Sequence, residues 1–198
     1  MVTYIRFSIQ LMDIGNIIDN IYPLAEQPKD LLKERIYEIT YPKAHLLFKE
    51  NRISSKVYFI KKGIVRAFAN RDEEEITFWF GKEGDAVISM KNYVDNQKGY
   101  ETIELMESCE LYEIQTEDLR ALYNNDIQIA NWGRKFAEQE LVKIEERFIS
   151  RQCKTAVERY KELMNNDPGL LQRVQLVHIA SYLGITPVSL SRIRSELK

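Results

Sequence analysis

The stretch VQLVHIASYLGITPVSLSRIRSELK, residues 174–198, is the most informative part of the chain. Its first half has apolar residues at helical spacing, namely Val177, Ala180 and Leu183. Gly184 follows, and glycine commonly ends a helix in the left-handed conformation. Thr186 then stands at the position of an N-cap, and Pro187 suits the first position of the next helix. The stretch therefore predicts two short helices joined by a tight turn.

The second of these helices has two different faces. Leu190, Ile193 and Leu197 are spaced three and four apart and predict a buried face. The opposite side carries hydroxyl and charged side chains: Ser189, Ser191, Arg192, Arg194, Ser195 and Glu196. Arginine can donate two hydrogen bonds to a guanine edge, and hydroxyl groups reach phosphates. We interpret the stretch as a helix-turn-helix that binds DNA; an ordinary αα-hairpin is the alternative.

Composition and charge limit the remaining classes. The chain has 198 residues, 44% hydrophobic and 29% charged, which is typical of one globular domain or two small ones. Residues 151–198 carry an excess of four positive charges although the whole chain has a formal charge of −2, a distribution that suits a polyanionic partner. No apolar run approaches the ~20 residues that span a bilayer, and no signal peptide is recognisable. We expect a cytoplasmic protein that does not bind membranes.

Short alternating segments follow one another from Arg35 to Ile114. They are predicted as strands at 35–41, 45–48, 56–60, 64–69, 75–80, 100–106 and 110–114. Strands of this length at spacings of ~8–12 residues indicate a sandwich or barrel. Before them, Ile14, Ile17, Ile18 and Ile21 predict a helix, which Pro23 and Pro28 are expected to interrupt.

After Ile114 the sequence becomes helical. Thr116 is predicted to cap a first helix, and a long helix follows from Asp126 to about 149. It carries an apolar stripe: Ala137, Leu141, Ile144 and Phe148. Either the β domain covers this stripe, or a second copy of the chain does so in a two-helix dimer seam. Another helix is predicted at 152–165, with Cys153 at its exposed start.

Four stretches resemble the Crp/Fnr type of transcription regulator, in the short form of Bacteroidetes-like bacteria. They are FKENRISSKVYFIKKGIVRAF (48–68), EITFWFGKEGD (75–85), RYKELMNNDPGLLQRV (159–174) and HIASYLGITPVSLSRIRSELK (178–198). The resemblance covers roughly residues 35–198 and implies an α+β fold. Its parts would be a cyclic-nucleotide-binding-like β-roll (1–124), a long dimerisation helix (125–149) and a winged-helix or helix-turn-helix domain (150–198). The chain ends almost at the recognition helix, so we expect no wing strand after it.

The resemblance also implies functional residues. The recognition helix would run from Pro187 to Glu196, with base-reading positions at Val188, Ser189 and Arg192. Phosphate contacts would come from Gln175 or its neighbours, Thr186, Ser191 and Arg194. Val188 departs from the acidic residue that is commoner there, so the operator sequence is left open. The implied partners are a pseudo-palindromic double-stranded DNA and a second copy; RNA polymerase and an unidentified small-molecule effector are further candidates.

The segment that corresponds to the family's effector pocket departs from the pattern of cyclic-nucleotide binders. The candidate pocket comprises Gly84, Asp85, Val87, Ile88, Ser89, Tyr100, Thr102 and Ile103. Binders of this family hold the phosphate with an arginine, yet residues 84–107 contain none, and its expected position falls at about Gly99. Glu101 adds a negative charge, and Lys91 or Lys98 lacks the arginine fork. We expect that cyclic-nucleotide binding is lost and that the pocket holds another ligand or none.

The sequence gives little support for a metal site or a catalytic site. His45 and His178 belong to different predicted domains, so no metal site is expected, and Cys109 is interpreted as a small buried residue. No catalytic motif is recognisable, and we expect neither enzymatic activity nor a cofactor. The alternative function is a β-roll that binds a small molecule or a partner protein, with C-terminal helices that pack without binding DNA.

Overall fold

The alternating segments form two four-stranded antiparallel sheets in the computed structural model, which describes residues 11–72 and 74–197. The strands are β1 Tyr37–Tyr41, β2 Leu46–Phe48, β3 Lys56–Lys62, β4 Val65–Arg71, β5 Glu74–Gly81, β6 Ala86–Val87, β7 Thr102–Leu105 and β8 Cys109–Gln115. One sheet has the order β1-β8-β3-β6 and the other β2-β7-β4-β5. Apolar side chains of both sheets, among them Ile60, Val65 and Leu111, are buried in one cluster. The predicted N-terminal β-roll is confirmed.

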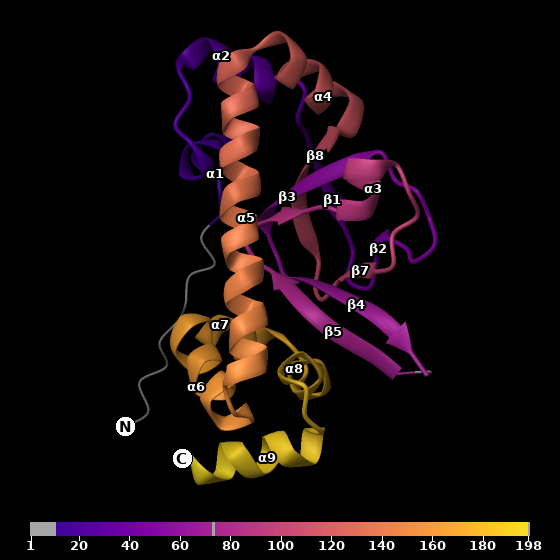
Figure 1. Ribbon diagram of the computed structural model, residues 1–198, viewed down its shortest axis with the longest axis vertical. Helices are drawn as coiled ribbons and strands as arrows, with labels where there is room; N and C mark the ends of the chain where they lie inside the picture. Colours follow the sequence, from indigo (N-terminus) through magenta and orange to yellow (C-terminus); the bar gives the residue numbers. More distant parts are fainter. Residues whose placement is uncertain (1–10, 73, 198) are drawn as a thin grey trace.

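Helices surround the sheets and form the rest of the chain (Figure 1). They are α1 Ile14–Ile21, α2 Glu26–Lys33, α3 Met90–Asp95, α4 Thr116–Asn125, α5 Ile127–Cys153, α6 Ala156–Asn166, α7 Pro168–Arg173, α8 Leu176–Leu183 and α9 Pro187–Glu196. Pro28 does not interrupt a helix as predicted: it is the third residue of α2, where its missing N–H would have no partner within the helix. Thr116 is not an N-cap but the buried first residue of α4, which follows Gln115.

The long helix α5 runs beside the β-roll along most of the molecule (Figure 1). The Asp126 carboxylate caps it by accepting hydrogen bonds from the N–H groups of Gln128 at 2.7 Å and Ile129 at 3.1 Å. The helix continues past its predicted end at 149 and includes Cys153, which therefore ends α5 instead of starting α6. It stops there because Thr155 forms a capping box with Glu158 and starts α6.

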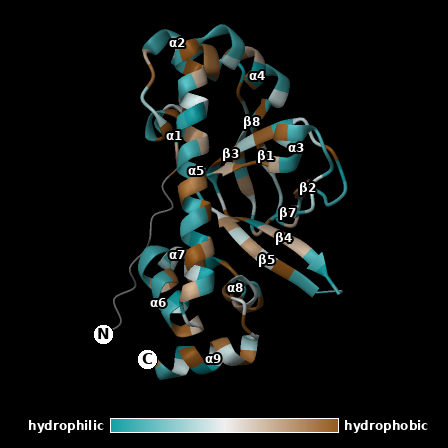
Figure 2. Cartoon of the chain, in the orientation of Figure 1, coloured by the Kyte–Doolittle hydropathy of each residue, from teal (hydrophilic) through white to brown (hydrophobic). Residues whose placement is uncertain are grey.

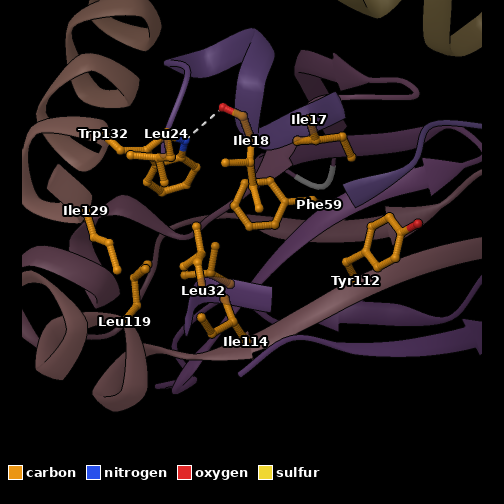
Figure 3. Close-up of a cluster of buried hydrophobic side chains, with 11 residues drawn as sticks. Ile17, Ile18, Leu24, Leu32, Phe59, Tyr112, Ile114, Leu119, Ile129 and Trp132 are labelled. Carbon is orange, nitrogen blue, oxygen red and sulfur yellow. Dashed lines mark hydrogen bonds between the residues drawn. The ribbon is translucent and has the colours of Figure 1, made fainter. Parts of the chain in front are cut away.

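The first part of α5 is fixed by a buried apolar cluster against the β-roll (Figure 3). Ile129 and Trp132 pack there with Ile18 of α1, Leu32 of α2 and side chains of β3 and β8. The indole N–H of Trp132 donates to the carbonyl oxygen of Ile18 at 3.0 Å. Complete burial of a large apolar side chain contributes about 1.5–3 kcal/mol or more, so Trp132 helps to hold α5 against the β-roll at this end.

Helices α6–α9 share a second buried cluster, which also includes Ile64 and Met106 of the β-roll. We call these four helices the head. No strand follows β8 in the described residues, so the head has a helix-turn-helix and no wing strand. Because Ile64 and Met106 belong to this cluster, the head core continues into the β-roll.

On α8, Ile179, Ala180 and Leu183 are buried, whereas Val177, which has the same helical spacing, is 49% exposed.

Candidate nucleic-acid interface and effector region

Helices α8 and α9 meet at a turn whose residues play the predicted roles. Gly184 ends α8 with φ +68°, in the left-handed region that suits glycine. The Thr186 hydroxyl accepts a hydrogen bond from the Ser189 N–H at 3.1 Å, and Pro187 occupies the first position of α9. Leu190 and Ile193 are buried in the head core. The predicted helix-turn-helix is confirmed in these local features.

The outer side of α9 is open to solvent. Val188 is 63% exposed, and Ser191, Arg192 and Arg194 are also exposed. Among the described residues, Arg192 and Arg194 form no ion pair, so both guanidinium groups keep their donors. Ser189 is half-buried at the start of the helix, where its hydroxyl lies 3.0 Å from that of Thr186. The arrangement can present two cations and several hydroxyl groups to a polyanion.

Residues at the start of α8 have different surroundings. Gln175 is exposed at the N-cap position, and its side chain makes no capping bond. His178 instead faces the β-roll, where burial first and the Arg66 guanidinium second lower the pKa of its imidazole. The structure thus leaves Gln175 accessible to a phosphate, whereas His178 belongs to the contact between head and β-roll.

That contact is built around Ser181 of α8 and strand β5. The Ser181 hydroxyl donates to the carbonyl oxygen of Glu75 at 2.9 Å and accepts from the N–H of Thr77 at 2.9 Å. Beneath it, the Arg66 side chain is 2% exposed and donates to Thr77 Oγ1, Glu104 and Glu75. A buried guanidinium is tolerated only when its donors are satisfied, as they are here.

Charged side chains extend the contact along the head. The Arg173 guanidinium pairs with Glu83 at 2.7 Å and also with Glu107. Desolvation of the Glu83 carboxyl is outweighed by hydrogen bonds from Arg173 and the Gly63 N–H, so its pKa is lowered. Lys82 contacts Asp167, and the rings of Phe80 and Tyr182 meet edge to face at 5.3 Å. The head is held against β5 by polar, ionic and aromatic contacts together.

The predicted dimerisation stripe is not covered by the β-roll. Leu141 is 66% exposed, Ile144 48% and Phe148 63%, and Ala137 is exposed as well. The stripe runs from the middle of α5 towards its C-terminal end, where apolar and polar residues alternate along the helix in Figure 2. Large exposed apolar side chains on one helix face indicate an interaction surface.

In the predicted effector region, the expected position of the phosphate-binding arginine falls at about Gly99. A Cβ atom at Gly99 would lie 2.7 Å from Ser89 Oγ and 3.2 Å from Glu101 Oε1, so a side chain there would require both neighbours to shift. Glu101 is 5% exposed, and its carboxylate accepts from the Tyr100 N–H at 3.0 Å. Lys91 and Lys98 are exposed. A buried carboxylate therefore stands where the family pattern needs a cation.

The eight predicted pocket residues fall into three surroundings. Val87 and Ile103 are close-packed between the sheets, and Ile88 packs against the cluster beneath α5. Gly84 and Asp85 form the turn before β6, where burial raises the pKa of the Asp85 carboxyl. Ser89 is buried and Tyr100 is exposed, while the Thr102 hydroxyl accepts from the Glu50 N–H at 3.3 Å. Only Ser89, Tyr100 and Thr102 adjoin the segment around Gly99.

Known proteins share this architecture. Residues 38–126 match the family model of the cyclic nucleotide-binding domain. A solved structure described as a Crp/Fnr-family transcriptional regulator from Eubacterium rectale is 17% identical, with TM-score 0.69, and the match covers 88% of this chain and 85% of that chain. The chain has the Crp/Fnr fold.

Two further solved structures share the Crp/Fnr fold with this chain. FixK2 from Bradyrhizobium japonicum is 22% identical, with TM-score 0.71 over 82% of this chain and 84% of that chain. The catabolite activator protein of Thermus thermophilus is 19% identical, with TM-score 0.55 over 89% and 85%. No curated protein sequence matches the chain. The predicted α+β class, with β-roll, long helix and helix-turn-helix, is confirmed.

Within the Crp/Fnr fold, sequence reasoning missed the residues that join the head to the β-roll. Arg66, Arg173 and Ser181 received no role, although each makes contacts across the chain. One signal was present for Arg66: a charged residue between Val65 and Ala67 in a strand must either reach water or find partners. The sequence gives no such signal for Ser181, because a serine on a helix is ordinarily exposed to solvent.

The described residues lack two further features. None of their helices is long and apolar enough to cross a membrane. They also contain no group of three histidine, cysteine or acidic side chains placed to hold a metal ion. Cys109 is buried, and burial is the main cause that raises the pKa of its thiol to about 12; Cys153 is exposed.

Proposed function

We propose that the protein is a sequence-specific, DNA-binding transcription regulator that acts as a homodimer. The observation that carries this proposal is the two-sided recognition helix: Leu190 and Ile193 are buried in the head, while Arg192 and Arg194 face solvent without ion pairs among the described residues. A helix of this kind can enter a major groove and read base edges with its arginine. The Eubacterium rectale protein, which has the same fold, is itself described as a transcriptional regulator.

The proposed site residues divide by role. Val188, Ser189 and Arg192 would read bases, with Val188 in apolar contact with a thymine methyl group. Gln175, Thr186, Ser191 and Arg194 would contact phosphates, together with the N-terminal turn of α9 at Pro187. Because the Ser191 hydroxyl already donates to the Pro187 carbonyl at 3.0 Å, it would serve a phosphate less well than Arg194.

The exposed stripe of α5 supports the homodimer. Ala137, Leu141, Ile144 and Phe148 would pack on the same residues of a second copy across a two-fold axis. Two heads then bind half-sites of a pseudo-palindromic operator. A cytoplasmic location, contact with RNA polymerase and the absence of enzymatic activity are part of the same proposal.

The alternative is a β-roll protein whose terminal helices only pack. That function predicts the Arg192 face turned against the β-roll. Instead α8 makes the contact, through Ser181 and Tyr182, and α9 lies at the end of the molecule away from the sheets (Figure 1). This placement favours the DNA-binding function.

The proposal is tested by selecting fragments of the organism's own genomic DNA with the purified full-length chain. We expect enrichment of a pseudo-palindrome whose half-sites lie one helical turn apart, about 10–10.5 base pairs centre to centre, or a multiple of it. The same selection with Arg192→Ala is the control for non-specific retention. Recovery of unrelated fragments by both proteins would contradict the proposal.

We expect no binding of cyclic AMP or cyclic GMP in the β-roll. Residues 84–107 supply no arginine for an anionic phosphate near Gly99, where it would meet the buried Glu101 carboxylate; an unpaired buried charge costs several kcal/mol, enough to remove micromolar binding. Calorimetric titration at about millimolar nucleotide should show no saturable heat. Binding of a selected operator by the same sample shows that the protein is active, and a nucleotide seen in the roll with Lys91 or Lys98 on its phosphate would contradict this expectation.

A further inference from the structure

A cavity of about 440 Å³ lies between β5, the second half of α5 and the head. We call it the interdomain cleft and define it by Phe80, Arg147, Arg151, Arg159 and Tyr182 on its walls. Its volume falls within the ~300–1,000 Å³ of small-molecule sites. It is separate from the segment around Gly99, and no residue of α9 lines it.

Most charged side chains on the walls of the interdomain cleft already have partners. Lys143 pairs with Glu140 at 2.7 Å, and Arg173 pairs with Glu83 at 2.7 Å. Lys82 contacts Asp167, and the Glu162 carboxylate pairs with Lys154 at 2.8 Å. Lys143 also pairs with Asp85 at 3.7 Å and Arg173 also pairs with Glu107, so these groups have no positive charge to spare for a ligand.

Three arginines of the cleft have no carboxylate partner among the described residues. Arg147 and Arg151 stand one turn apart on α5 and form no ion pair. Arg159 donates only to backbone carbonyl oxygens, including that of Leu183 at 2.8 Å, and its Nε is buried without any partner. Glu146 is the one wall carboxylate for which the described residues supply no cation. Six basic and five acidic side chains line the cleft, an excess of one positive charge, and the Arg159 Nε is one unsatisfied donor.

The uncharged part of the cleft is aromatic. Phe80 of β5 and Tyr182 of α8 meet edge to face, and the Tyr182 hydroxyl makes no hydrogen bond to a described residue. Burial raises the pKa of Tyr182; Asp167 and Glu162 add to this rise, and Arg147 and Arg151 act against it. Arg147, Arg151 and Tyr182 all line the cleft, so a ligand in the cleft lies beside both arginines and the tyrosine.

We propose that the interdomain cleft binds a small organic phosphate monoester with a flat, apolar body. The monoester carries nearly two negative charges at neutral pH, which the three arginines without carboxylate partners can neutralise, and its oxygens suit the arginine forks. Phe80 and Tyr182 would contact the apolar body. Cyclic AMP carries a single charge and fits this donor set less well. Such a ligand contacts α5, α6 and α8 at once, so it bridges the long helix and the head.

Phenyl phosphate is the probe that tests the proposal, by calorimetric titration of the full-length chain at about pH 8, where its phosphate is a dianion. We expect saturable binding with a dissociation constant below about 1 mM. The double variant Arg147→Gln, Arg151→Gln should weaken it at least about tenfold, because two charged donors are removed. Arg134→Gln is the matched control: it removes one charge from the same helix but lies outside the cleft, paired with Glu138, and should bind like the wild type.

Several results would overturn the proposal. They are the absence of saturable heat with the wild type, unchanged binding by the double variant, and equally tight binding of inorganic phosphate or of benzoate. Equal binding of inorganic phosphate would mean that the aromatic wall contributes nothing, and equal binding of benzoate that the dianion does not matter. The titration contains no DNA, so its outcome is independent of the proposed function.

Discussion

The double variant Leu141→Glu, Ile144→Glu will be a folded monomer that has lost tight operator binding. Both side chains are exposed in the single chain, so the substitution leaves the cores of the β-roll and head intact. In the proposed dimer it removes four buried apolar side chains, each contributing about 1.5–3 kcal/mol, and places four carboxylates at the seam. One head alone keeps only the contacts of one half-site.

Analytical ultracentrifugation at micromolar concentration and operator titration measure the two consequences. Val142→Glu, Ile149→Glu is the matched control, because both residues are exposed apolar side chains on α5 but lie roughly a third of a turn away from the stripe. This control should remain dimeric and bind the operator. A wild type that sediments as a monomer and still binds the operator tightly would refute the seam.

The second large effect is expected at Arg192. If its guanidinium donates to a guanine edge, Arg192→Ala costs about 1–3 kcal/mol per half-site, which for two heads is roughly a 30-fold to 10⁴-fold loss of operator affinity. Specificity at the contacted base pair should relax at the same time. Fold stability should not change, because Arg192 is exposed and forms no ion pair among the described residues.

Arg194→Ala is the comparison for Arg192→Ala. As a phosphate contact it should weaken binding to operator and random DNA alike, and it should reduce the salt dependence by about one counterion per head. Titrations of both variants at several salt concentrations separate base reading from charge neutralisation. Equal affinity of the wild type and Arg192→Ala for the selected operator would rule out the role of Arg192.

Local signals explain why much of the fold could be predicted. The turn between α8 and α9 depends on Gly184, Thr186 and Pro187, which act through their own backbone and nearest neighbours. The strands follow from alternation over a few residues, and the apolar stripe of α5 follows from its helical spacing. The missing arginine of the effector segment was also readable, since it needs only the residue types between Gly84 and Glu107.

Helix ends were less predictable for a physical reason. Pro28 lies within α2 because the first turn of a helix tolerates proline, and whether that turn forms depends on Leu32 reaching the core. Similarly, α5 extends beyond its predicted end and stops at Cys153, just before the capping box of Thr155 and Glu158 that starts α6. Single-residue preferences are too weak to place such boundaries.

The β-roll, the long helix, the helix-turn-helix and the absence of an arginine from residues 84–107 could all be read from the residues, because each depends on positions close together in the chain. The position of the head on the β-roll follows from long-range contacts in the folded molecule. Ser181 reaches Glu75 and Thr77 across more than a hundred residues, and Arg173 joins Glu83 and Glu107. The interdomain cleft exists only once these long-range contacts have formed, since its walls come from segments that share no local pattern.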